Sequence, residues 1–245
     1  MTTRPLPVPR GWFISLEGPE GSGKTSQAEA LRARFAATGF NVTLTREPGG
    51  TPTGERIRAI LLQHAAVGGA TGEPTPRTDA LLFNAARAQL VAEVIGPAIA
   101  RGDVVLCARF ADSTMAYQGH GAGLPPDALR TLERFATDGL RPDLTLLLDV
   151  PPEVGLARKS GDEVTRFEAG FDVAFHRRVR NGFLALAAAE PGRFAVIDAT
   201  GAFAAVFDAL VATIADRLPE LAAVLARPRD AVGDEPPPIP LRIPR

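Results

Sequence analysis

The stretch GPEGSGKT, residues 18–25, follows the apolar run WFISLE (12–17) and precedes a segment with helical periodicity. It matches the pattern GxxxxGK[ST], in which the glycines let successive backbone N–H groups point at phosphate oxygens and the following helix contributes its positive end. The pattern requires a strand before it and a helix after it, and this sequence supplies both. The stretch therefore predicts a phosphate-binding P-loop.

Loops of this kind divide the contacts to a nucleotide among their residues. Lys24 is expected to contact the β and γ phosphates, and Thr25 is expected to contact a magnesium ion. We expect seven residues of this stretch to bind ATP: Gly18, Gly21, Ser22, Gly23, Lys24, Thr25 and Ser26. The alternative is a glycine-rich turn without a ligand, which would not require every fixed position of the pattern.

Apolar runs along the chain predict the fold class. Five short runs alternate with longer segments of helical periodicity: 12–17, 42–46, 104–108, 144–150 and 194–198. Runs that are apolar on both faces and separated by helices indicate a parallel sheet covered on both sides. We predict an α/β, three-layer P-loop NTPase fold with a five-stranded parallel sheet flanked by helices and a short lid.

Two helices can be placed from the pattern alone. One runs from Lys24 to Thr38 and is expected to end at Gly39 in the left-handed conformation. The longest spans roughly residues 78–100 and carries Phe83 and Arg87 on one stripe.

Length and composition exclude several classes of protein. The chain has 245 residues, a net charge of −1 and one cysteine. The charge provides no extended positive field for nucleic acid, and a single cysteine excludes an internal disulfide or a cysteine-rich zinc site. The sequence contains neither a run of about 18 apolar residues nor a signal peptide at its N-terminus. We expect a cytoplasmic protein that binds neither nucleic acid nor membrane.

Proline-rich segments stand at both ends of the chain. Residues 1–10 and 227–245 combine repeated proline with few aromatic residues, a composition that disfavours packing. We predict that both are disordered tails, although the PPPIP segment could also be a ligand for a partner. The P-loop domain is then predicted to span residues 11–226.

The P-loop by itself does not separate a motor, a GTPase and a small-molecule kinase. The sequence has no NKxD segment after a strand and no acidic pair closing a strand, and it is too short for a second motor domain. A single small P-loop domain favours phosphoryl transfer between two small molecules.

Six further segments follow the P-loop in a fixed order. They are TREPGG (45–50), GERIR (54–58), LLFNAAR (81–87), ARFADSTMAYQG (108–119), RPDLTLLLDV (141–150) and TRFE (165–168). Over roughly residues 12–216, this series closely resembles bacterial thymidylate kinases, a family of P-loop nucleoside monophosphate kinases. The resemblance implies that a homodimer transfers the γ-phosphoryl group of ATP to dTMP, with Mg²⁺, and forms dTDP for dTTP synthesis.

The resemblance also implies an acceptor site. Ten residues would bind dTMP: Glu20, Pro48, Arg58, Phe83, Arg87, Arg109, Ser113, Thr114, Tyr117 and Gln118. Glu20 would accept a hydrogen bond from the sugar hydroxyl. Arg58 and Arg109 would bind the acceptor phosphate, because guanidinium groups fork onto phosphate oxygens. Arg58 is equally compatible with a surface charge on a helix.

Other members of this set would surround the base and sugar. Phe83 would stack on thymine, with a core position as its alternative, and Arg87 would address the edge of the base from the same helix face. Tyr117 would exclude a 2′-hydroxyl. Pro48 is expected in a tight turn near the acceptor phosphate, with a cis peptide bond as one possibility.

A lid is implied from about residue 158 to 168. Arg158, Lys159 and Arg166 are candidates for neutralising charge in the transition state, with an ordinary solvated charge run as the alternative. Glu168 would join Thr25 in the magnesium shell. Four residues are thus implied to be catalytic: Lys24, Arg109, Arg158 and Arg166.

The sequence departs from the family at two positions. Ala108 stands where relatives carry an aspartate before the arginine, and Thr165 stands where an acid is common. The missing carboxylate would orient Arg109 or a magnesium-bound water, so either another acid replaces it or catalysis is weakened. The candidate replacements are Glu20, Asp112, Asp149 and Glu168. Two alternatives stay open: a kinase for another nucleoside monophosphate, and a nucleotide-binding regulator without activity.

Overall fold

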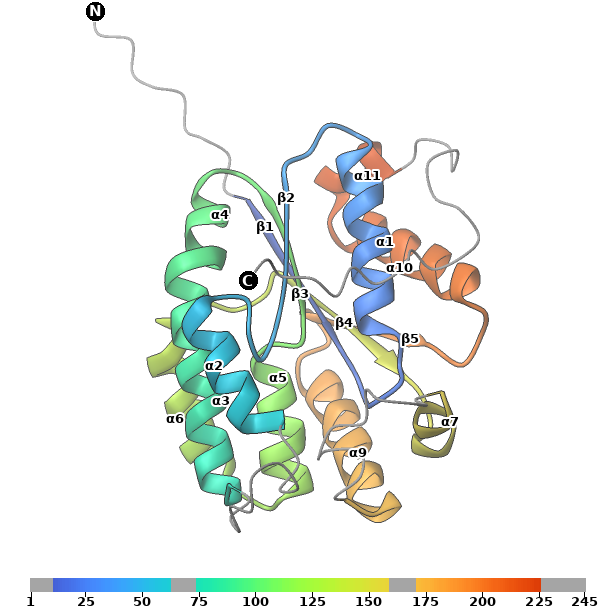
Figure 1. The fold of residues 1–245 in the computed structure, drawn as a ribbon. Helices are drawn as coiled ribbons and strands as arrows, with labels where there is room; N and C mark the ends of the chain where they lie inside the picture. Colours follow the sequence, from blue (N-terminus) through green and yellow to red (C-terminus); the bar gives the residue numbers. More distant parts are fainter. Residues whose placement is uncertain (1–10, 63–73, 159–170, 226–245) are drawn as a thin grey trace, which may run out of the picture.

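The computed structural model describes residues 11–62, 74–158 and 171–225 (Figure 1). These residues form a five-stranded parallel sheet in the order β2-β3-β1-β4-β5. The strands are β1 (Trp12–Glu17), β2 (Val42–Arg46), β3 (Val104–Ala108), β4 (Leu144–Asp149) and β5 (Phe194–Asp198). The predicted α/β fold is confirmed, and only β4 differs in its bounds, since it ends one residue before the expected Val150.

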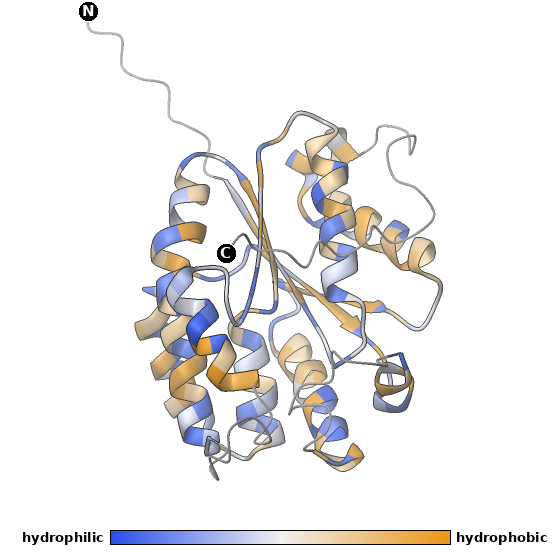
Figure 2. Cartoon of the chain, in the orientation of Figure 1, coloured by the Kyte–Doolittle hydropathy of each residue, from blue (hydrophilic) through white to orange (hydrophobic). Residues whose placement is uncertain are grey.

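The central strands are apolar because both of their faces are covered. Every residue of β3 is buried, as are five of the six residues of β1 and of β4. The edge strands β2 and β5 are more exposed. In Figure 2 the strands are mostly orange and lie between helices of mixed colour. Continuous apolar runs of this kind are typical of parallel sheets.

Helices connect the strands and cover the sheet. In chain order, the α-helices are α1 (Lys24–Ala36), α2 (Pro52–Leu62), α3 (Pro76–Leu90), α4 (Gly96–Ala100), α5 (Ala111–Thr114), α6 (Pro126–Thr137), α7 (Pro152–Ala157), α9 (Val173–Ala189), α10 (Phe203–Arg217) and α11 (Pro219–Leu225). Two π-helical segments lie between them, η1 (Val91–Ile95) and η2 (Met115–Gly121). The helix predicted at 78–100 is therefore interrupted by η1.

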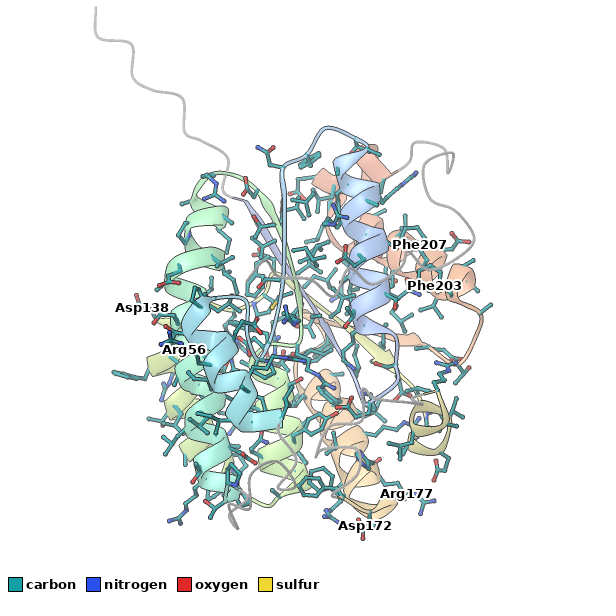
Figure 3. The ribbon with its side chains drawn as sticks, in the orientation of Figure 1. Arg56, Asp138, Asp172, Arg177, Phe203 and Phe207 are labelled. Carbon is teal, nitrogen blue, oxygen red and sulfur yellow. The ribbon has the colours of Figure 1, made fainter. Side chains whose placement is uncertain are left out.

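Local signals explain several helix ends. The side chain of Asp172 caps α9 by accepting the Phe175 N–H at 2.7 Å, and it lies at the start of that helix in Figure 3. Thr75 caps α3 in the same way. The predicted left-handed Gly39 is confirmed, with φ of 89°. Because glycine tolerates this conformation, the chain leaves α1 there and turns toward β2.

Two layers of helices enclose the sheet. Helices α1, α10 and α11 pack with Ile14, Leu16 and the alternate residues of neighbouring strands. Phe203 and Phe207 of α10, labelled in Figure 3, stack in this layer. Their ring centroids are 6.5 Å apart. The other face, which includes Phe13, is covered by α3, α4 and α9. Residues 12–17 thus alternate between two separate cores.

The topology places the candidate functional residues beyond the carboxyl ends of the strands. The chain moves from β1 to the β2 edge, returns to β3, and then crosses to β4 on the other side of β1. In open α/β sheets, ligands bind beyond the carboxyl ends of the strands where the strand order reverses. The P-loop follows β1 at that position. The predicted tails lie outside the described residues.

Candidate active site

The P-loop is arranged around the ammonium group of Lys24. Its Nζ donates to the carbonyl oxygens of Gly18 (2.9 Å) and Pro19 (2.6 Å) and to the Ser22 hydroxyl (3.0 Å). Gly23 precedes α1 with φ of 86°, a conformation that L side chains rarely adopt. The loop therefore directs the N-terminus of α1 and its first cation toward one point, as the sequence pattern predicts.

A second glycine allows the P-loop to approach α7. A Cβ atom built on Gly155 would lie 2.2 Å from the Glu20 carbonyl oxygen, and one built on Gly21 would lie 1.8 Å from the Gly155 carbonyl oxygen. The two backbones are in contact only because both residues lack side chains. The motif predicts Gly21, whereas nothing local indicates Gly155, whose partner is distant in the chain.

Arg109 connects the end of β3 to the P-loop. Its Nη2 donates to the Glu20 carboxylate at 2.5 Å and to the Tyr117 hydroxyl at 3.3 Å, and Nη1 donates to the Gly18 carbonyl and the Ser113 hydroxyl, both at 3.3 Å. Tyr117 also donates to Glu20 at 2.8 Å. Four residues predicted to bind the acceptor, Glu20, Arg109, Ser113 and Tyr117, are therefore brought together.

Charge and burial set the protonation of this cluster. Burial, together with the Glu20 carboxylate, raises the pKa of Tyr117 well above its usual range, so the phenol stays a donor. Burial acts to lower the pKa of Arg109, but the neighbouring Glu20 carboxylate raises it overall. At neutral pH Arg109 is therefore a cation and Tyr117 a neutral phenol.

Arg87 is buried in an ion pair rather than placed on an open helix face. Its guanidinium donates to Glu47 at 2.7 Å, and the two side chains are 1% and 3% exposed. It also donates to the Asn84 side chain, the Phe110 carbonyl and the Thr114 hydroxyl. The sequence placed Arg87 and Thr114 in the site but gave Glu47 no role, because nothing local indicates which cation its carboxylate meets.

The TREPGG turn meets α2 beside this pair. The Glu47–Pro48 peptide bond is cis, the possibility raised from the sequence. The Pro48 carbonyl accepts a hydrogen bond from Arg58 at 2.9 Å, which holds that guanidinium next to the turn. Phe83 is half-buried and packs against the cluster that contains Tyr117 and Phe175. Gln118 is buried in η2.

Glu17, the last residue of β1, contacts this cluster although no motif of the sequence indicates it. Its side chain is fully buried and accepts the Phe110 backbone N–H at 2.7 Å and the Ser113 hydroxyl at 2.6 Å. Burial raises its pKa to about 7, and the carboxylate of Asp112 acts in the same direction. The only local signal was an acid at the end of an otherwise apolar strand.

Arg158, predicted to belong to the lid, lies away from this cluster. It donates to the carbonyl oxygens of Ala199 and Thr200, both at 2.7 Å, beyond the end of β5. Lys159, Thr165, Arg166 and Glu168 lie outside the described residues, so their roles stay predictions.

Comparisons with known proteins agree with this geometry. The thymidylate kinase family model matches residues 16–210. The chain belongs to the thymidylate kinase family. It is 51% identical to the thymidylate kinase of Thermomicrobium roseum, over 84% of this chain and 95% of that one, and 53% identical to that of Deinococcus radiodurans, over 78% and 90%. The crystal structure of thymidylate kinase from Ehrlichia chaffeensis covers 84% of this chain and 99% of its own, with a TM-score of 0.65 and 32% identity.

Membership in the thymidylate kinase family confirms the recognition made from the TREPGG and STMAYQG blocks, and with it the class of enzyme. Within the described part of the chain, no helix is long and apolar enough to cross a membrane.

The structure shows what the departure at Ala108 can affect in this thymidylate kinase. Ala108 pairs in register with Leu16, so its side chain shares the face of the sheet that α1 covers. Glu17 projects from the opposite face. A carboxylate at position 108 would therefore face the side of α1, the helix that follows the P-loop, rather than the contacts that hold Phe110 and Ser113.

Two of the proposed replacement acids are already paired elsewhere. Asp112 forms two bonds with Arg193, at 2.6 and 2.8 Å, and Asp149 forms two with Arg180, at 2.7 and 2.8 Å. Glu20 is the one candidate among the described residues that contacts Arg109 directly.

The Arg87–Glu47 pair generates a prediction about stability. Glu47→Gln leaves a buried guanidinium without its counter-charge, so the free energy of unfolding should fall by about 3–5 kcal/mol. Urea denaturation at pH 7.5 measures the difference. Glu55→Gln, which removes the half-buried partner of Arg46, is the control and should cost no more than about 1 kcal/mol. A loss as small as the control's would contradict this account of the pair.

The contact between Gly155 and the P-loop generates a second prediction. Alanine is favoured over glycine inside a helix by about 1 kcal/mol, but Gly155→Ala would force the Glu20 carbonyl to move. Since a displacement of about 1 Å can cost about 100-fold in rate, kcat/KM for ATP should fall by about 10- to 100-fold. Steady-state kinetics tests this. Gly192→Ala is the control, because a Cβ there meets nothing within 4 Å; equal kinetics of the two variants would refute the prediction.

Proposed function

We propose that the protein transfers the γ-phosphoryl group of ATP to dTMP and releases ADP and dTDP. The observation that supports this most directly is the ion pair between Glu20 and Arg109 at 2.5 Å. It joins the phosphate-binding loop to the segment that carries Ser113 and Tyr117. The loop for the donor nucleotide and the residues for the acceptor therefore share one edge of the sheet.

The residues of this chain would act by alignment and charge neutralisation. Lys24 would exchange its contacts with loop oxygens for oxygens of the β and γ phosphates, since all are ammonium acceptors. Arg109 and Arg58 would hold the phosphate of dTMP in line with the γ phosphate. The acceptor phosphate is itself the nucleophile, so no covalent intermediate on the protein is needed.

Selectivity for dTMP would come from the buried polar groups beneath the acceptor. Tyr117 is held in place by Glu20 and by the Arg109 guanidinium, 5.1 Å above its ring. A fixed phenol at that position leaves no room for a 2′-hydroxyl if the sugar lies over it. Arg87, Gln118 and Phe83 would read the base, and a site that hydrogen-bonds one base edge rejects bases that leave it unpaired.

Magnesium fits the residues that are present. Among the described residues, no group of three or more His, Cys, Asp or Glu side chains could hold a metal ion. Mg²⁺ in kinases takes one or two protein ligands and completes its shell with phosphates and water. The exposed Thr25 hydroxyl on the first turn of α1 would be such a ligand, with Glu168 acting through water. The ion would neutralise charge on the phosphates.

A homodimer is supported by exposed apolar side chains on three adjoining helices. Ile60, Leu81 and Phe135 are 54%, 57% and 91% exposed, and they belong to α2, α3 and α6. Helix α3 packs against both other helices, and the three lie together in Figure 1. We propose that a second copy covers this surface, and that the enzyme works in the cytoplasm, where its substrates are made.

A coupled assay tests the proposed function. With ATP and Mg²⁺, dTMP should be phosphorylated with a far higher kcat/KM than dCMP, dGMP, AMP or UMP. Lys24→Ala should lose at least about 30-fold in kcat, equivalent to about 2 kcal/mol, while its circular dichroism spectrum stays unchanged. Equal rates with AMP would contradict the acceptor assignment, and full activity of Lys24→Ala would contradict the donor assignment.

The position of Ala108 generates a separate prediction. Since its side chain faces the α1 side of the sheet, Ala108→Asp should raise kcat or lower the magnesium concentration needed for half-maximal rate, by about 10-fold, without changing KM for dTMP. The substitution places a carboxylate at a site that is only 6% exposed, which lowers the stability of the fold if the group stays unpaired. A melting curve therefore accompanies the kinetics. A well-folded variant with an unchanged magnesium profile would show that position 108 has no part in binding the ion.

A further inference from the structure

We propose that Glu17 is the positioning residue of the acceptor site, and that its buried carboxylate fixes the direction in which Arg109 leaves the sheet. This inference rests on the proposed role of Arg109 in binding the acceptor phosphate. Glu17, the last residue of β1, then supports Arg109 from the face of the sheet opposite to Ala108.

The backbone at Arg109 needs such support. Arg109 has φ of 68°, in the left-handed region that costs a residue with a side chain roughly 1–2 kcal/mol. It is one of two described non-glycine residues with positive φ, and the other, Asp138, lies at the C-terminus of α6. The Arg109 N–H still bonds to the Leu16 carbonyl at 2.9 Å, so the chain turns sharply immediately after its last sheet bond.

The next residue, Phe110, is held from two sides. Its N–H donates to Glu17 at 2.7 Å, and its carbonyl accepts from Arg87 at 3.2 Å. Its ring packs edge-on against Phe13 with centroids 5.0 Å apart. With both peptide groups and the ring fixed, the turn at Arg109 has little freedom. Of the two polar anchors, Glu17 is the one that binds the peptide group next to Arg109 itself.

The second oxygen of Glu17 acts on the Arg109 side chain through Ser113. The Ser113 hydroxyl donates to Glu17 at 2.6 Å, which leaves its lone pairs to accept from Arg109 Nη1 at 3.3 Å. If Glu17 were protonated, the hydrogen bond from Ser113 would no longer be strengthened by charge, and the attraction between the Glu17 carboxylate and the Arg109 guanidinium would be lost. The ionised form is therefore the one that orients Arg109.

Charged and titratable groups surround Glu17 on every side. Asp112 on α5 disfavours its ionisation, and Arg109 favours it. On the same face of the sheet, Arg87 of α3 and the Cys107 thiol of β3 are close enough for the Glu17 charge to raise the pKa of each. Asp112 is neutralised by Arg193, which limits its repulsion. The balance leaves the Glu17 pKa at about 7, so its ionisation changes within the range of a kinetic assay.

Glu17→Gln separates this role from a purely structural one. The amide has the same shape and can still accept the Phe110 N–H, but it carries no charge. We expect kcat/KM for dTMP to fall by about 10- to 100-fold at pH 8, while KM for ATP stays within about twofold.

The variant should not be less stable. A carboxyl group whose pKa is raised in the folded state stabilises the fold only while protonated, and that contribution is lost as the pH rises through about 7. Removing the charge therefore leaves the melting temperature at pH 8 equal or higher.

The pH profile supplies a second, independent measurement. For the wild type, kcat/KM for dTMP should rise between pH 6 and 8 in two steps, one from the phosphate of dTMP, with a pKa of about 6, and one from Glu17. Glu17→Gln should retain the first step and lose the second. Glu17→Asp keeps the charge but shortens the side chain by one methylene. This variant should have a lower kcat/KM for dTMP than the wild type and still show both steps.

Asp103→Asn is the matched control. Asp103 is a 5% exposed acid just before β3, at the other end of the strand, bonded to Thr43 and Arg101. Its replacement should leave the kinetics and the pH profile unchanged.

A double-mutant cycle shows whether Glu17 acts through Arg109. If it does, the losses in kcat/KM for Arg109→Lys and Glu17→Gln should not multiply in the double variant. Losses in kcat/KM that multiply fully would overturn the proposal, as would an unchanged pH profile in Glu17→Gln. A lower melting temperature of Glu17→Gln, with equal losses in kcat/KM for dTMP and for ATP, would also overturn it. An inactive wild type in the monophosphate panel would contradict the proposed function itself, whereas an active wild type with an unaffected Glu17→Gln variant contradicts this inference alone.

Discussion

The ion pair between Arg109 and Glu20 is the interaction on which the rest of the site depends. It joins the end of β3 to the loop after β1, two segments that are 89 residues apart in the chain. Both segments follow the carboxyl ends of strands whose residues are almost all buried. A charged group there is poorly solvated by water, so an opposite charge from the other segment stabilises it. The pair therefore links the position of the P-loop to that of the segment that carries Ser113 and Tyr117.

Two other buried arginines are each matched by an acid. Arg87 meets Glu47, and Arg193 meets Asp112 through two hydrogen bonds while its guanidinium lies over the Phe194 ring. Removing one partner of a buried pair is costly because the other is left in a medium that solvates it poorly. The segment from residue 109 to 118 is thus held by ion pairs to the P-loop and to Arg193, which precedes β5, and by hydrogen bonds to Glu17 of β1 and Arg87 of α3.

The strand register changes the interpretation of Ala108, because its side chain and that of Glu17 lie on opposite faces of the sheet. From the sequence, a missing carboxylate next to Arg109 suggested a weakened arginine. The strand register places side chain 108 with Leu16, toward α1, whereas the contacts that orient the chain after Arg109 come from Glu17 on the other face. At this point the α1 side of the sheet therefore carries an alanine, while the contacts of Glu17 with Phe110 and Ser113 lie on the other side.

The sequence by itself determined the fold class, the strands and the P-loop, because these depend on patterns within a few residues: apolar runs, glycines where φ is positive, and a lysine at a fixed place before a helix. Through the family resemblance of their segments it also predicted Glu20, Arg109, Ser113 and Tyr117, which the structure places in contact with one another. Only the tertiary structure decided the partners of Glu17, Glu47 and Gly155. Their roles arise from contacts across 40 to 135 residues of chain, where the strand order and the face of the sheet select the partner. No local pattern carries that information, because an acid at the end of a strand looks the same whichever cation or N–H group it will meet.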